Sequence, residues 1–179
     1  MGFPYSSGDV LTAADLNQSS GMVFIKSVSV GSGVSSVTVS DAFSSNFDNY
    51  YVIVSGVDSS TTSNADVRVG SKTGQYYGSG VRTYFNSAIV IPDNVNNGSA
   101  WFGGIFATNS AGHMKWTFSN PNVTGKPVSF SAFGVGSGYQ VWWAGDGGSS
   151  TTNFTDFSVS PSSGTISGGI IRLYGYNDG

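Results

Sequence analysis

The 179-residue sequence contains no cysteine, no glutamate and a single histidine. Without cysteine, neither a disulfide framework nor a cysteine-based zinc site can stabilise the fold. One imidazole, that of His113, cannot build a multi-histidine metal site, and we interpret it as a solvated residue next to the start of a strand. The sequence therefore predicts a chain that is stabilised by packing and that holds no metal and no cofactor.

Charge is also scarce, at 9% of the residues against about a quarter in ordinary globular proteins. All ten acidic residues are Asp, and only seven residues are Lys or Arg, so the usual surface residues of amphipathic helices are nearly missing. The net charge of −3 and the scattered basic residues provide no surface for a phosphate backbone, so we expect no nucleic-acid partner. No apolar run approaches the roughly 20 residues that span a bilayer, and the N-terminus has no classical secretion signal, so no membrane insertion is expected.

Short runs rich in Val, Ile and aromatic residues alternate instead with clusters of Gly, Asn, Ser and Asp. About ten such runs predict an all-β protein, an antiparallel sandwich or barrel with one head domain over residues 22–179. In the run at 113–119, Met114, Trp116 and Phe118 should point inward, and the residues between them should face water. The run at 50–57 is apolar on both faces, which hints at a neighbouring subunit.

The residues between 76 and 100 combine turn signals with one apolar run. We interpret the Gly-rich YYGSGV at 76–81 as a turn and DNVNNGSA at 93–100 as a polar loop, because Gly and Asn tolerate tight turns. The apolar residues at 81–91 are then predicted as a single strand.

The N-terminal segment 1–21 differs from the body, because SSGDVLTAADLNQSSG carries helix signals. Thr12 and Asp15 have the spacing of a capping box, and the segment is predicted as a short helix or arm of two turns at most. So short a helix is marginal in water and needs a partner surface. That surface is either the protein's own sandwich or another protein, and Leu11, Ala14 and Leu16 are the candidate attachment residues.

The segment MGFPYSSGDVLTAADLNQ resembles the N-terminal motif of many bacteriophage fibre and appendage proteins, in which a G-x-V-L-T-A-A-D-L-N stretch opens the chain. The terminal GGIIRLYGYNDG and the run at 31–57 are similar in composition to strands of short phage fibre proteins. The resemblance implies a structural protein of the virion surface, attached through its N-terminus to a portal, adaptor, tail or capsid protein. It further implies a homotrimer with a sandwich or jelly-roll head that faces the bacterium. The chain lacks a long shaft, which favours a short tail fibre or a head fibre.

Host-surface polysaccharide is the expected ligand of such a head, because aromatic rings cover the C–H faces of sugars while amides and hydroxyls bind sugar hydroxyls. Alternation in YQVWWAG places Trp143 on one face of a strand and Trp142 on the other. Trp142 is therefore the first candidate platform, although packing at a subunit interface would also explain its position. The remaining candidates are Trp101, Tyr76 and Tyr77, whereas Trp116 is assigned to the core.

Other functions stay open on the sequence alone. A cellular or secreted carbohydrate-binding module, or a purely structural head-decoration protein, has the same composition. Paired carboxylates can hydrolyse glycosides, and the nearest pair to consider is Asp146 and Asp156. No Ser-His-Asp motif accompanies them, and we expect no enzymatic activity.

Overall fold

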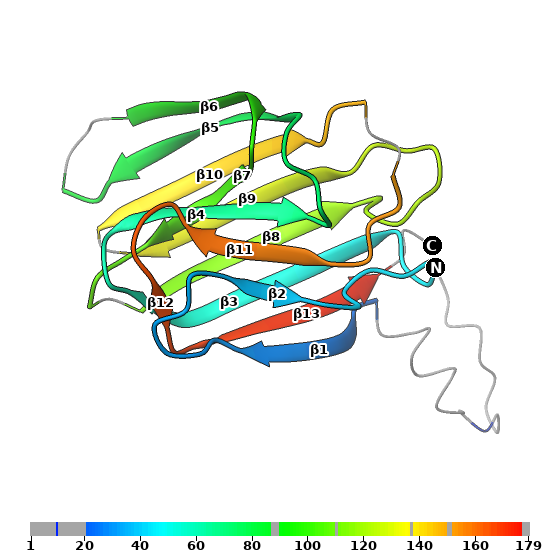
Figure 1. Ribbon diagram of the computed structural model, residues 1–179, viewed down its shortest axis with the longest axis horizontal. Helices are drawn as coiled ribbons and strands as arrows, with labels where there is room; N and C mark the ends of the chain where they lie inside the picture. Colours follow the sequence, from blue (N-terminus) through cyan, green and yellow to red (C-terminus); the bar gives the residue numbers. More distant parts are fainter. Residues whose placement is uncertain are drawn as a thin grey trace.

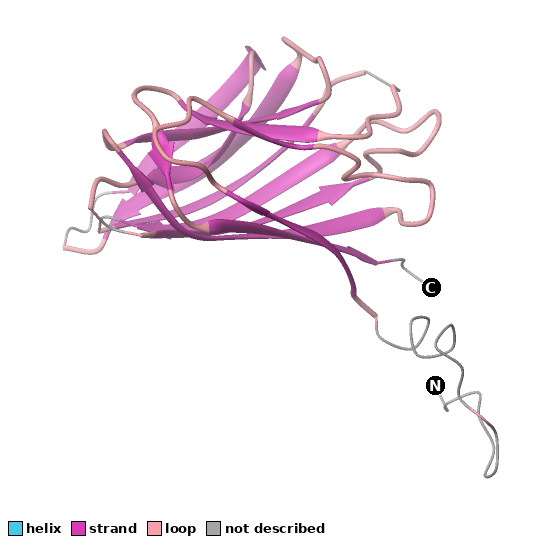
Figure 2. Ribbon diagram, turned by 60° about the horizontal axis from the view of Figure 1, so that its bottom comes forward, coloured by secondary structure: helices cyan, strands magenta, loops and turns pink. Residues whose placement is uncertain are grey.

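The computed structural model describes residue 10 and residues 21–86, 90–109, 111–136, 138–149 and 152–176. Within these residues the chain is all-β, with thirteen strands in two antiparallel sheets that pack face to face (Figures 1 and 2). This confirms the predicted sandwich. The described part of the chain includes no helix long and apolar enough to cross a membrane.

The strands are short and follow one another closely along the chain. In order they are β1 Val23–Ser29, β2 Val37–Val39, β3 Asn49–Ser59, β4 Ser63–Val69, β5 Tyr76–Tyr84, β6 Val90–Gly98, β7 Trp101–Phe106, β8 Gly112–Ser119, β9 Ser129–Gly136, β10 Tyr139–Asp146, β11 Phe157–Pro161, β12 Ile166–Ser167 and β13 Ile170–Tyr176.

The pairing of the strands is that of a jelly roll. The first four strands pair in reverse order with later ones: β1 with β13, β2 with β11, β3 with β8, and β4 with β7. The four pairs form one long hairpin that is rolled up. The pairing of β13 with β3 joins two of these strand pairs into one sheet, and the pairing of β11 with β4 joins the other two into the second sheet. The result is two four-stranded layers, β1-β13-β3-β8 and β2-β11-β4-β7, the eight strands of a jelly roll.

Two further hairpins enlarge one of these layers. Strands β5 and β6 lie between β4 and β7 in the chain, and β9 and β10 lie between β8 and β11. Both hairpins join the larger sheet, which continues from β8 in the order β9-β10-β5-β6, while the smaller sheet remains four-stranded. The smaller sheet lies across one face of the larger sheet, and the other face has no covering strand among the described residues (Figure 1).

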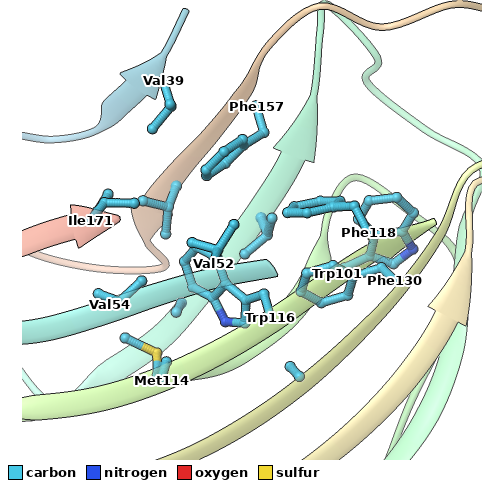
Figure 3. Close-up of a cluster of buried hydrophobic side chains, with 14 of the residues drawn as sticks. Val39, Val52, Val54, Trp101, Met114, Trp116, Phe118, Phe130, Phe157 and Ile171 are labelled. Carbon is cyan, nitrogen blue, oxygen red and sulfur yellow. The ribbon is translucent and has the colours of Figure 1, made fainter. Parts of the chain in front are cut away.

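Aromatic side chains fill the space between the sheets (Figure 3). Trp101 from the smaller sheet stacks on Phe130 from the larger, with ring centroids 4.9 Å apart and planes within 5° of parallel. Trp116 is fully buried, and its indole N–H donates to the carbonyl oxygen of Gly103 at 2.7 Å. Met114 and Phe118 are buried beside it, which confirms the predicted alternation of this strand.

Three predictions for residues 76–100 are wrong. The apolar run at 81–91 is not one strand, because it contains the end of β5 and the start of β6. The Gly-rich stretch 76–81 is not a turn but the first part of β5. Gly80 is needed there by close packing: a Cβ at this position would overlap the carbonyl oxygen of Trp142 and approach the Cα of Trp143 to 2.7 Å. Likewise, most of the predicted polar loop belongs to β6, which continues to Gly98.

The first strand begins at Val23, next to the predicted start of the head. The attachment candidates Leu11, Ala14 and Leu16 lie outside the described residues, as does the predicted N-terminal helix. The division into an arm at 1–21 and a head at 22–179 stays a prediction.

Candidate functional site

The uncovered face of the larger sheet carries a row of large side chains. Residues directly opposite each other on antiparallel strands lie on the same face, so the strand register defines the row. Trp142 of β10 lies opposite Phe133 of β9 and Val81 of β5. The row crosses six strands and consists of Ile53, Lys115, Phe133, Trp142, Val81 and Pro92.

Trp142 is the most exposed tryptophan of the four, with 47% of its surface accessible. Its ring lies 5.6 Å from that of Phe133, at an angle of 42° between the planes. The two rings therefore support each other while one face of the pair remains open to solvent. The predicted outward orientation of Trp142 is confirmed, and its role as a sugar platform stays a prediction.

The next row of the same face consists of small side chains. Thr117, Ser131, Ala144 and Ser79 lie side by side on β8, β9, β10 and β5. A row of small residues beside a row of large ones leaves a depression, and the structure has a hollow of about 600 Å³ at this place. Tyr51, opposite Thr117 on β3, also lines it. A smaller hollow of about 230 Å³ adjoins it and extends along β8 and β9 to Ser119 and Ser129.

The lining of the larger hollow is apolar with a few polar groups. The rings of Trp142, Phe133 and Tyr51 and the side chain of Val81 supply the apolar surface. Ser79, Thr117 and Ser131 contribute hydroxyl-bearing side chains to the lining. Among the described residues that line the hollow, Lys115 alone carries a charge. This combination of rings and hydroxyls fits a polyhydroxylated ligand better than an aliphatic one.

Trp101 does not belong to this site, which corrects the sequence interpretation. It follows the strand β6 rather than a polar loop, and its side chain is fully buried between the sheets. Its indole N–H donates to the carbonyl oxygen of Asp146 at 2.9 Å. A ring that is stacked on Phe130 and has no accessible surface cannot cover a sugar.

Tyr76 is likewise a core residue and not a ligand platform. Its ring is fully buried with its edge against Trp101, at 4.8 Å between centroids. The hydroxyl accepts a hydrogen bond from the backbone N–H of Val69 at 3.1 Å and donates to the carbonyl oxygen of Lys72 at 3.2 Å. Burial raises the pKa of Tyr76 to about 12 because the phenolate would lose its hydration.

Tyr77 lies on the outer face, as alternation from Tyr76 requires. It is half-buried and pairs with Asp146, at the end of β10 and outside the hollow at Trp142. Gly148 packs on this ring, since a Cβ there would meet it at 2.9 Å. Tyr77 is therefore on the correct face but does not contact the hollow.

The carboxylates considered for hydrolysis have local partners. Asp146 accepts a hydrogen bond from the backbone N–H of Gly148 at 2.6 Å, and Asp156 is 3.4 Å from the hydroxyl of Thr155. His113 is exposed on β8, one outward position from Lys115. None of these three residues lines the larger hollow.

Phe133 and Tyr51 are parts of the hollow that sequence reasoning missed. A signal for Phe133 was present, because Phe130 and Phe133 are three residues apart in one strand. An odd spacing places two residues on opposite faces, so one of the two rings had to point outward. Tyr51 belongs to the run at 50–57 that is apolar on both faces, but the sequence alone does not show which residues of β8 lie beside it.

A second apolar area lies near the edge of the same face, on β1, β13 and the residues before β1. Phe24 is 55% exposed and contacts Tyr174 edge-on at 5.6 Å. Met22 is also exposed and lines, with Tyr51 and Tyr176, a separate hollow of about 460 Å³. We call Met22, Phe24 and Tyr174 the edge patch.

Comparison with protein-family models finds no match, and comparison with curated proteins finds no significant match.

Proposed function

We propose that the protein is a bacteriophage virion protein, a short tail fibre or head fibre, whose jelly-roll head binds a host-surface glycan. The observation that carries the binding proposal is the hollow beside Trp142, in which the exposed indole of Trp142 and the partly buried rings of Phe133 and Tyr51 adjoin hydroxyl side chains. A pyranose ring has a C–H face that stacks on an indole, and its equatorial hydroxyls find partners in Ser and Thr side chains. The hollow is open and shallow, as a site for an internal part of a polymer needs to be.

The virion part of the proposal rests on the resemblance of GDVLTAADLN to phage attachment segments and is supported by the fold class. Jelly rolls occur in viral capsid and lectin domains, although a fold alone does not define a function. In this proposal residues 1–21 attach the protein to a portal, adaptor, tail or capsid protein. Leu11, Ala14 and Leu16 supply the apolar contacts, and the head faces outward.

Binding of fluorescently labelled protein to a panel of bacterial strains tests the glycan proposal. We expect binding to some strains, its loss after enzymatic removal of their surface polysaccharide, and at least about tenfold weaker binding by Trp142→Ala. Thr38→Ala, on the outer face of the smaller sheet, is the matched control and should bind like the wild type. Binding that is unaffected by Trp142→Ala would remove the hollow from the proposal.

Deletion of residues 1–19 tests the attachment proposal separately. The shortened protein should remain folded and bind the same strains, because the first strand begins only at Val23. It should no longer be incorporated into phage particles. Normal incorporation of the shortened protein would contradict the role of Leu11, Ala14 and Leu16.

We further propose that the head is a homotrimer in which the edge patch contacts a neighbouring copy. Support comes from the exposure of Phe24 and from the scarcity of charge, since like surfaces approach without a large Coulomb cost. Light scattering should give three times the monomer mass, and Phe24→Lys should lower it. A monomer at micromolar concentration would contradict this proposal and leave the glycan proposal standing.

A further inference from the structure

We infer that the hollow beside Trp142 selects an acidic polysaccharide, with Lys115 binding the carboxylate of a uronic-acid residue. This inference rests on the proposed glycan-binding function and names the ligand class. It is carried by the position of one lysine in a hollow whose other described lining residues are uncharged.

Lys115 is placed to contact a ligand that stacks on Trp142. It is on β8 opposite Phe133, which in turn lies opposite Trp142. Neighbouring strands are about 4.8 Å apart, so the two Cα atoms are separated by roughly 10 Å, about the length of a disaccharide. A sugar stacked on the indole would therefore place the next residue of the chain within reach of the Lys115 side chain.

Among the residues that the structure describes, no carboxylate pairs with the charge of Lys115. Arg82 forms an ion pair with Asp93 at 2.9 Å, and Arg68 forms one with Asp66 at 3.6 Å. Lys115 has no ion pair and no hydrogen bond with any residue that the structure describes. A cation without such a partner, in the same hollow as the exposed ring of Trp142, is available to a ligand carboxylate.

Its surroundings do not neutralise it either. The whole chain has a net charge of −3, yet no carboxylate lines the described part of the hollow. The outward residues of β10 include Asp146, but this carboxylate accepts a hydrogen bond from Gly148 and lies beyond the hollow. The hollow is thus locally positive on an acidic protein, which complements an anionic polymer.

Lysine at this position has a second interpretation, in which it only keeps an apolar face soluble. In that case its charge contributes nothing to ligand binding, and neutral and acidic glycans bind equally. The two interpretations differ in one measurable quantity, the ratio of affinities for a polymer with and without its carboxylates.

The experiment uses the full-length protein and polymers in matched pairs. Alginate, polygalacturonate and the surface polysaccharides of bound strains are each tested in native form and after chemical reduction of their carboxylates to alcohols, with dextran as a neutral polymer. We expect at least one native acidic polymer to bind the wild type about tenfold more tightly than its reduced form. Lys115→Gln should bind both forms equally, and Lys115→Arg should retain the preference. Lys126→Gln is the matched charge control on an exposed loop and should behave like the wild type.

The outcomes separate the inference from the proposed function. Equal binding of native and reduced polymers, with loss of both in Trp142→Ala, overturns the acidic ligand and leaves the glycan site standing. A preference for the native polymer that Lys115→Gln retains would also overturn the inference and leave the glycan site standing. So would binding of teichoic acid, whose charge is on phosphate, if no uronate polymer binds. No binding to any polysaccharide overturns the inference together with the glycan proposal.

Discussion

The outer faces of the two sheets differ sharply, although both belong to one sandwich. The smaller sheet presents Thr38, Ser158, Ser160, Asp66 and Arg68. Three of these side chains bind each other: Arg68 donates to the hydroxyl of Ser160 at 3.0 Å and forms an ion pair with Asp66 at 3.6 Å. The larger sheet presents the exposed ring of Trp142 and the partly buried ring of Phe133, and their polar neighbours have few such bonds among the described residues.

The difference between the two outer faces shows where this chain departs from what folding alone requires. A sandwich needs one apolar face per sheet, and water suffices for the other. The smaller sheet follows this rule, whereas the larger sheet keeps Trp142 and Phe133 on its solvent side. Four strands contribute small residues to the hollow beside Trp142. Three of them, β5, β9 and β10, belong to the added hairpins. The additions to the jelly roll therefore build the candidate site.

The largest loss of stability is expected for Trp101→Ala, which attacks the face shared by both sheets. The substitution removes a fully buried ring, its stack on Phe130 and its hydrogen bond to Asp146. Unfolding in urea should show a loss of about 3–5 kcal/mol. A loss below about 1 kcal/mol would mean that the two inner faces are not packed as described.

Gly80→Ala is expected to cost less, about 1–3 kcal/mol, because it forces β5 away from β10. A Cβ would overlap the carbonyl oxygen of Trp142, and the shift would move Val81 and Ser79 at the hollow. Gly74→Ala is the control, since a Cβ there meets nothing within 4 Å. Thermal melts should separate the two variants, and equal melting temperatures would contradict the close approach of β5 and β10.

The buried hydroxyl of Tyr76 should make stability fall at high pH. Its pKa is about 12 in the folded protein and about 10 when unfolded, so between these values the unfolded chain loses the proton first. Loss of a proton by the unfolded state alone favours unfolding as the pH rises.

The matched variant is Tyr76→Phe, which has no proton to lose at this position. The free energy of unfolding of the wild type, measured relative to that of Tyr76→Phe, should be constant below pH 10 and should fall between pH 10 and pH 12. Urea titrations at several pH values measure this difference. A difference that stays constant up to pH 12 would show that the hydroxyl is not buried.

Trp142→Ala is expected to have the smallest effect on stability, below about 1 kcal/mol, because the ring is half exposed. Its effect on ligand binding should nevertheless be the largest of the series. A large fall in melting temperature would place this ring in a packed interface and weaken its assignment as a platform.

The sequence predicted the sandwich because alternation and turn residues are local signals. The strand at Gly112–Ser119 shows this most clearly, since every second residue is buried. Trp142 and Trp143 could be separated for the same reason. The orientation of a ring within its own strand is a local property.

Other features depended on pairing between distant segments. Trp101 and Tyr76 are buried because the strands β7 and β5 contact β9 and β10, and no local signal describes that contact. The hollow itself arises from register, which places Thr117, Ser131, Ala144 and Ser79 side by side from four strands. Gly78 and Gly80 led to the wrong prediction of a turn at 76–81, because glycine occurs where strands pack closely as well as in turns.

The central claim, that the outer face at Trp142 binds the ligand, can be tested with the four indole N–H resonances of the protein. The spectrum of ¹⁵N-labelled protein is recorded during titration with polysaccharide from a strain that the protein binds, and Trp142→Ala assigns the resonance of this residue. The account predicts that the Trp142 resonance shifts while those of the buried Trp101 and Trp116, which do not line the hollow, stay in place. Binding that leaves the Trp142 resonance unchanged would contradict it.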